Sequence, residues 1–158
     1  MAENLYFVAN SGAVTTAGIA PVNTLTSACV PLQISVPSTR QISIIEYGVS
    51  FNGTPAAIHV DLRSTGTTMG GTTASPAVLP YSNPNAPASL CTCLYGTTMG
   101  APAGTVSGYY DTQIISSNTY IKQFPLAREP VAAVSTFVNI VVTSSAAIGC
   151  TAYIIWRE

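Results

Sequence analysis

Apolar side chains recur at every second residue in short runs of this chain, and Gly, Pro, Asn and Ser separate the runs. Successive side chains of an extended strand point to opposite faces, so this alternation is typical of strands that bury one face. No stretch shows the spacing of an amphipathic helix. The pattern predicts an all-β fold, and about eight short strands favour a two-sheet β-sandwich with jelly-roll-like topology.

The clearest strand covers residues 41–51, where one face is lined by Ile45, Tyr47, Val49 and Phe51. Asn52-Gly53 follows directly, and this dipeptide tolerates the positive φ angles of a tight type I′ turn. The next run, Ala57 to Arg63, alternates apolar residues with polar ones. We therefore expect residues 41–63 to form a β-hairpin whose second strand is buried on one face and exposed on the other.

Two C-terminal runs, Ser135 to Ser144 and Gly149 to Arg157, carry bulky apolar residues on both faces. Strands of this kind lie in the middle of a sandwich or beneath a neighbouring subunit. Weaker runs predict strands at residues 4–9, 32–36, 106–116 and 120–124. We treat residues 1–158 as one domain whose terminal arms are held in a sheet or by neighbours.

Between Ser64 and Ala103 the alternation fails, and Gly, Thr, Ala and Pro dominate. Only short β fragments are predicted in this segment, at residues 77–79 and 90–94. Long irregular segments inside a compact domain are commonly functional or ordered by a partner. We therefore expect residues 64–103 to form a loop-rich excursion from the sandwich.

Charged residues are scarce: five basic and six acidic side chains make up 7% of the chain, against about 25% in an ordinary soluble domain. Exposed charges keep free monomers apart, so this composition indicates a surface covered by other protein and favours an assembly component. The net charge is −1, and the scattered bases argue against a nucleic acid partner: Arg40, Arg63, Lys122, Arg128 and Arg157. The longest apolar run, Phe137 to Thr143, is too short to cross a membrane.

Candidate catalytic groups are few. His59 is the only histidine, and although Asp61 shares its strand face, the sequence singles out no nucleophile beside them. The acidic residues form no close pair of the kind that glycosidase or Ca²⁺ chemistry uses. We interpret His59 as an exposed strand residue and predict no enzymatic activity. We expect Glu46, in an otherwise apolar strand, to form an ion pair with Arg40, Arg63 or Arg157.

The four cysteines are Cys29, Cys91, Cys93 and Cys150. Metal sites commonly use two close pairs of ligands, whereas this chain has one C-x-C and two distant cysteines. We expect reduced, half-buried thiols that act as small hydrophobic side chains, with a disulfide or a metal site as the alternatives. No cofactor is predicted.

Tyrosines concentrate in the middle of the chain, where loops are predicted: Tyr81, Tyr95, Tyr109, Tyr110 and Tyr120. Tyrosine combines a large, rigid contact area with a polar tip and is enriched at interfaces. These five residues are our candidate interface within or between subunits, and stacking on a sugar is the alternative.

Three segments carry a family resemblance: residues 120–130 (YIKQFPLAREP), 84–89 (PNAPAS) and the closing 153–158 (YIIWRE). With them the chain resembles the small all-β capsid decoration, or cement, proteins of tailed bacteriophages. The resemblance implies a β-sandwich or β-tulip-like body that forms a trimer or other small oligomer on the outer surface of the phage head. Its loops and arms would bridge major capsid proteins and stabilise the lattice. The protein would be made in the host cytoplasm and reside in the virion.

A tail-fibre or receptor-binding β-module, binding carbohydrate, is the alternative function. Such a module would also be neutral and rich in tyrosine, but it would gather exposed aromatic side chains around one pocket. The sequence leaves this choice open.

Overall fold

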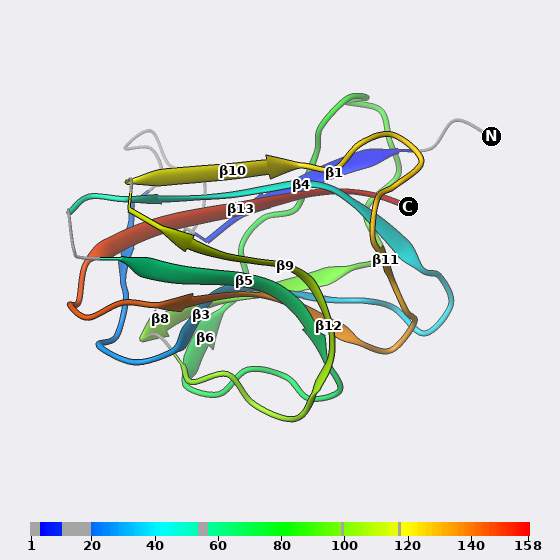
Figure 1. Ribbon diagram of the computed structural model, residues 1–158. Helices are drawn as coiled ribbons and strands as arrows, with labels where there is room; N and C mark the ends of the chain where they lie inside the picture. The colour runs from blue at the N-terminus through cyan, green and yellow to red at the C-terminus, as the bar shows by residue number, and fades with distance from the viewer. Residues whose placement is uncertain (1–3, 11–19, 54–56, 99, 117) are drawn as a thin grey trace.

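The computed structural model describes residues 4–10, 20–53, 57–98, 100–116 and 118–158, and the statements below concern these residues. They contain no helix and form thirteen strands in two antiparallel sheets that pack face to face (Figure 1). The prediction of an all-β, two-sheet sandwich is therefore confirmed.

The sheet drawn at the top of Figure 1, sheet A, has the order β10-β4-β13-β1-β7, with β11 also paired to β4 and β2 to β13. Its strands are β1 (Leu5–Ala9), β2 (Val22–Asn23), β4 (Ile42–Phe51), β7 (Leu79–Pro80), β10 (Thr119–Gln123), β11 (Val131–Ala132) and β13 (Gly149–Arg157). Sheet B has the order β6-β8-β3-β12-β5-β9. Its strands are β3 (Cys29–Ser35), β5 (Ile58–Thr65), β6 (Thr72–Ala74), β8 (Thr92–Thr98), β9 (Val106–Ile115) and β12 (Phe137–Thr143).

The core lies between the two C-terminal strands, which is one of the two arrangements that their doubly apolar pattern predicted. In sheet A, β13 lies between β4 and β1, and in sheet B, β12 lies between β3 and β5. Their core-facing side chains are fully buried: Val138, Ile140, Val142, Cys150, Ala152, Ile154 and Trp156. β1 pairs with the end of β13, so the described parts of both termini lie side by side in sheet A.

A β-bulge in β4 changes which residues of that strand face the core. Trp156 pairs with Ile44 and Ile155 with Glu46, so Ile45 is an extra residue in the ladder. A bulge shifts the alternation by one position. Ile44 is therefore fully buried while Ile45 lies outside the core, and the prediction that Ile45 shares the core face with Tyr47 was wrong.

The predicted hairpin at Asn52-Gly53 is also wrong, because β4 belongs to sheet A and β5 to sheet B. β4 already has β10 and β13 as neighbours, and Gly53 has no positive φ. Asn52 instead holds the start of β13: its N–H donates to the Gly149 carbonyl at 3.0 Å, and its Oδ1 accepts from the Gly149 N–H at 2.7 Å. Residues 54–56, the rest of this connection, lie outside the described residues.

The segment 64–103 is irregular between β6, β7 and β8, and its first part covers the outer face of sheet B. Met69 packs on Val30 and Val141, and all three are buried although they lie outside the main core. Beside them runs a polar chain: Thr68 donates to Gln33 Oε1 (2.8 Å) and Gln33 to Asn139 Oδ1 (2.6 Å). Asn139 in turn donates to Thr65 Oγ1 (2.9 Å). Contacts within the chain therefore order this part of the excursion.

The backbones of Gly70 and Gly100 lie in close contact within this segment. Substitutions at two glycines test how much this contact stabilises the fold. A Cβ added at Gly100 would lie 1.6 Å from the Gly70 carbonyl oxygen, whereas one added at Gly66 would meet no atom within 4 Å. Gly100→Ala should therefore lower the free energy of unfolding by roughly 1–3 kcal/mol. Gly66→Ala is the control and should change it by less than about 0.5 kcal/mol. Equal chemical-denaturation midpoints for the two variants would show that the contact contributes nothing.

Candidate functional site

A row of aromatic rings crosses the outer surface of sheet A. The rings of Phe7 and Tyr153 stack with centroids 5.8 Å apart, and Phe7 stacks on Tyr81 at 6.4 Å. The row forms because alternation along β1 turns Tyr6 and Val8 into the core and Phe7 outward. It therefore runs over three neighbouring segments of the sheet, from β13 through β1 to the end of β7.

A glycine makes room for one end of this row. Tyr153 pairs directly with Gly48 on β4, and a Cβ at Gly48 would lie 2.4 Å from the Tyr153 ring. The ring crosses the glycine, and the Tyr153 hydroxyl donates to Glu46 Oε1 at 2.6 Å. Burial and this hydrogen bond to the carboxylate raise the pKa of Tyr153. The partner of Glu46 here is a tyrosine hydroxyl, whereas the sequence had predicted an arginine.

Aliphatic side chains extend the aromatic row to both edges of the sheet. Ile121 on β10 pairs with Gly48 and is 57% exposed, and Leu79 on β7 pairs with Phe7 and is 41% exposed. We call the surface formed by Phe7, Leu79, Tyr81, Ile121 and Tyr153 the aromatic face. An antiparallel sheet with one solvated side ordinarily carries polar residues there, so the apolar composition of the aromatic face makes it the candidate functional site.

A pocket of about 410 Å³ opens beside the aromatic face. It is lined by Leu5, Ile45, Gln123, Phe124, Pro125, Leu126, Glu129 and Arg157. An ion pair forms part of the wall, with Arg157 Nη2 3.7 Å from Glu129 Oε1. The bulged residue Ile45 thus contributes to this surface.

A strained turn projects a leucine at the rim of this pocket. The Arg128 N–H donates to the Pro125 carbonyl (2.9 Å), and Ala127 has a φ of 66°. Positive φ at the third turn position defines a type II turn, which favours glycine there. Leu126 is 84% exposed at the tip. Strain of this kind often accompanies a functional surface, so the turn belongs to the candidate site.

The five tyrosines singled out from the sequence lie in different places. Tyr81 is on the aromatic face, and Tyr95 is buried in the core. Tyr110 and Tyr120 are partly buried against the core, and Tyr109 is exposed on β9 of sheet B. The sequence reasoning missed Phe7, Ile121, Leu126 and Tyr153. The outward apolar positions of β1, β10 and β13 were the signal for three of them.

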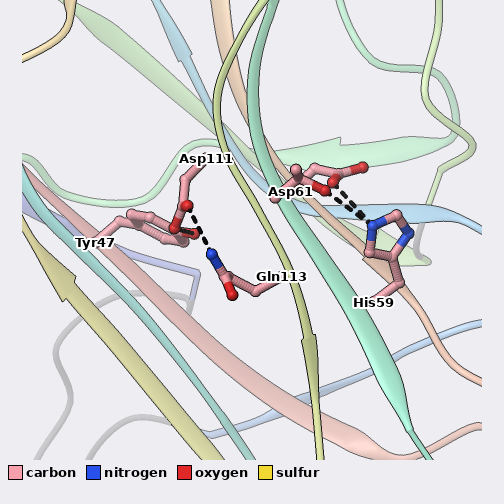
Figure 2. Close-up of polar contacts among 6 residues, drawn as sticks. Tyr47, His59, Asp61, Asp111 and Gln113 are labelled. Atoms are coloured by element: carbon pink, nitrogen blue, oxygen red, sulfur yellow. Dashed lines mark hydrogen bonds and ion pairs between the residues drawn. The ribbon is translucent and has the colours of Figure 1, made fainter.

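A carboxylate joins the two sheets at their β9 and β10 edges. Asp111 Oδ2 accepts hydrogen bonds from Tyr47 (2.8 Å) and Tyr120 (2.7 Å), and Oδ1 accepts from Gln113 (3.1 Å); Figure 2 shows the contacts with Tyr47 and Gln113. Burial alone would raise the pKa of Asp111, but these hydrogen bonds outweigh it and hold the pKa below its usual range. Burial and the Asp111 carboxylate raise the pKa of Tyr120 to about 12.

His59 lies on the outer face of sheet B, and Figure 2 shows it beside Asp61. Its Nε2 atom is 3.0 Å from Thr112 Oγ1 and 3.3 Å from Asp61 Oδ1. A catalytic triad needs the nucleophile and the carboxylate on opposite ring nitrogens, whereas here both contact the same nitrogen. The geometry is that of an exposed strand histidine with polar neighbours.

All four cysteines are free and buried. Cys29 donates to the Val142 carbonyl at 3.4 Å, and burial raises the pKa of every one of the thiols. Thiols of this kind are unreactive because the thiolate is the nucleophile and the metal ligand. Within the described residues, no three His, Cys, Asp or Glu side chains gather as metal ligands.

No protein-family model, curated protein or solved structure matches this chain. Nor does the part of the chain that the structure describes contain a helix that could span a membrane.

The Asp111 cluster gives a pH-dependent prediction. A carboxyl whose pKa is lower in the folded state stabilises the fold above its unfolded pKa of about 4, and the stabilisation is lost as the pH falls through the folded value. The free energy of unfolding of Asp111→Asn should therefore be lower than that of the wild type at pH 7, and this gap between the two proteins should become smaller at acidic pH. Urea denaturation across pH measures this gap. A gap independent of pH would rule out the ionised carboxylate as its source.

Proposed function

We propose that this protein is a structural virion component, a capsid decoration protein that binds the outer surface of a phage head. It acts as a homo-oligomer without enzymatic activity, and it stabilises the lattice by bridging major capsid proteins. The observation that carries the proposal is the aromatic face, a largely apolar surface that runs across sheet A from β10 to β7, with the Glu46 carboxylate at its Tyr153 end. The resemblance to phage capsid decoration proteins indicates the partner, which is the major capsid protein.

The chemistry of this surface supports a broad protein contact. The interior of protein interfaces is depleted of charge and enriched in tyrosine and phenylalanine. The aromatic face has both properties, and the exposed Leu126 beside the pocket adds an apolar anchor. A chain with so few charges gains little from ionic steering, so its attachment depends on shape and on apolar burial.

A carbohydrate-binding receptor module is the second candidate, and the same row of rings is the observation that favours it. Aromatic faces stack on sugar rings, and the carboxylate of Glu46 lies at one end of the row to accept hydroxyl groups. The proposed capsid role takes precedence because aliphatic side chains, which offer a sugar no hydrogen bonds, flank the row at both edges.

Two equally exposed tyrosines test where the partner binds. Tyr81 on the aromatic face and Tyr109 on sheet B are each 59% exposed. Tyr81→Ser should weaken binding to particles stripped of this protein by about tenfold or more, because it removes the most exposed ring of the aromatic face. Tyr109→Ser should bind like the wild type. Occupancy of the particles in electron-microscopy maps measures both. Equal effects would contradict the assignment, and binding to host glycans in place of particles would favour the second candidate.

The proposal also predicts how attachment responds to salt. The Debye length falls to about 3 Å at 1 M salt, which weakens contacts between exposed ions but not apolar or neutral hydrogen-bonded contacts. Particles washed in about 1 M NaCl should therefore retain the protein, as measured by gel densitometry of sedimented particles. Release by salt would indicate an ionic attachment and contradict the proposal.

A further inference from the structure

Four edges bound the two sheets in the described residues, and three of them are protected against pairing with another strand. Sheet A ends at one side in β10, which has five residues and carries Lys122. Its other side ends in β7, two residues long with Pro80. One side of sheet B ends in β6, with three residues. Short strands, lysine and proline are the features by which proteins keep sheet edges from associating.

The fourth edge, β9, has none of these three features, although β-bulges, which also protect edges, interrupt its N-terminal half. It is ten residues long and contains neither lysine nor proline. Both register shifts against β5 lie in its N-terminal half, so Asp111 to Ile115 pair regularly with β5. A regular edge strand presents unpaired N–H and C=O groups, which form a template for an added strand.

The side chains of this half of β9 favour an uncharged partner strand. Ile114 is 74% exposed, so an added strand would bury a large apolar side chain there. Asp111 is the only charged residue of β9, and its carboxylate already accepts hydrogen bonds from Tyr47, Tyr120 and Gln113. A strand added here would therefore not leave that charge unpaired.

We propose that β9 is a self-association edge, through which two copies of this chain pair antiparallel about a two-fold axis. A register centred on Gln113 places Thr112 of one copy opposite Ile114 of the other, a favourable cross-strand pair of β-branched residues. The same register separates the two Asp111 residues by about 14 Å along the strands, beyond the Debye length of about 8 Å at physiological salt. A net charge of −1 adds little repulsion between copies. This contact specifies how the homo-oligomer of the proposed function forms, and it does not depend on the identity of the capsid partner.

Sedimentation equilibrium of the full chain tests the proposal. The wild type should be a dimer at micromolar concentration, and Ile114→Lys should raise the dimer dissociation constant at least about tenfold by adding an edge charge. Val131→Lys is the matched control, because Val131 is an exposed β-branched residue on β11 (52%), outside both β9 and the aromatic face. It should leave the dimer intact, and circular dichroism should show both variants folded.

Hydrogen exchange of the wild type gives a second measurement that needs no variant. Amides in residues 111–115 should exchange more slowly as protein concentration rises, whereas amides in β10 should not. A wild-type monomer or trimer, an Ile114→Lys dimer as tight as the wild type, or exchange independent of concentration would each overturn the proposal. Particle binding by Tyr81→Ser addresses the capsid function separately, so failure of one proposal leaves the other testable.

Discussion

The central strand β13 carries apolar side chains on both of its faces, and the packing of the other elements follows from this. This strand lies at the centre of sheet A, and its alternation sends Ile154 and Trp156 into the core and Tyr153 and Ile155 to the outer surface. A sandwich of two sheets has one core between them, so a strand with two apolar faces leaves one face uncovered by the opposite sheet. That face must be covered by the chain itself or by another protein.

The two sheets meet this requirement differently. On sheet B, Met69 covers the outward Val141, and the hydrogen bonds of Gln33 and Asn139 satisfy the polar groups buried with it. On sheet A, Ile155 pairs directly with Phe7 and is only 5% exposed, but Tyr81 remains 59% exposed. The outward Val141 at the centre of sheet B is therefore covered by its own chain, whereas Tyr81 on sheet A is not. This difference is the physical basis for proposing sheet A as the surface that binds the capsid.

The polar clusters of this protein are explained by packing. Tyr47 is fully buried, and its hydroxyl needs an acceptor, which Asp111 supplies from the opposite sheet. Tyr120 on β10 donates a second hydrogen bond to the same carboxylate. Asp111 therefore links the two sheets at the side of the sandwich where β9 and β10 lie. Because Asp111 is engaged inside its own chain, the charge on β9 does not protect that edge in the way that a solvated lysine would.

The amino-acid sequence was enough to predict the all-β class and the apolar residues on both faces of β12 and β13, because period-two patterning is a local property of each strand. Three further features follow from long-range packing: β4 and β5 enter different sheets, Ile45 is a bulge, and Tyr81 joins Phe7 while Tyr95 joins the core. These outcomes depend on which strands become neighbours. Pairing between residues far apart in the chain is fixed by the packing of the whole sandwich, and no local pattern encodes it.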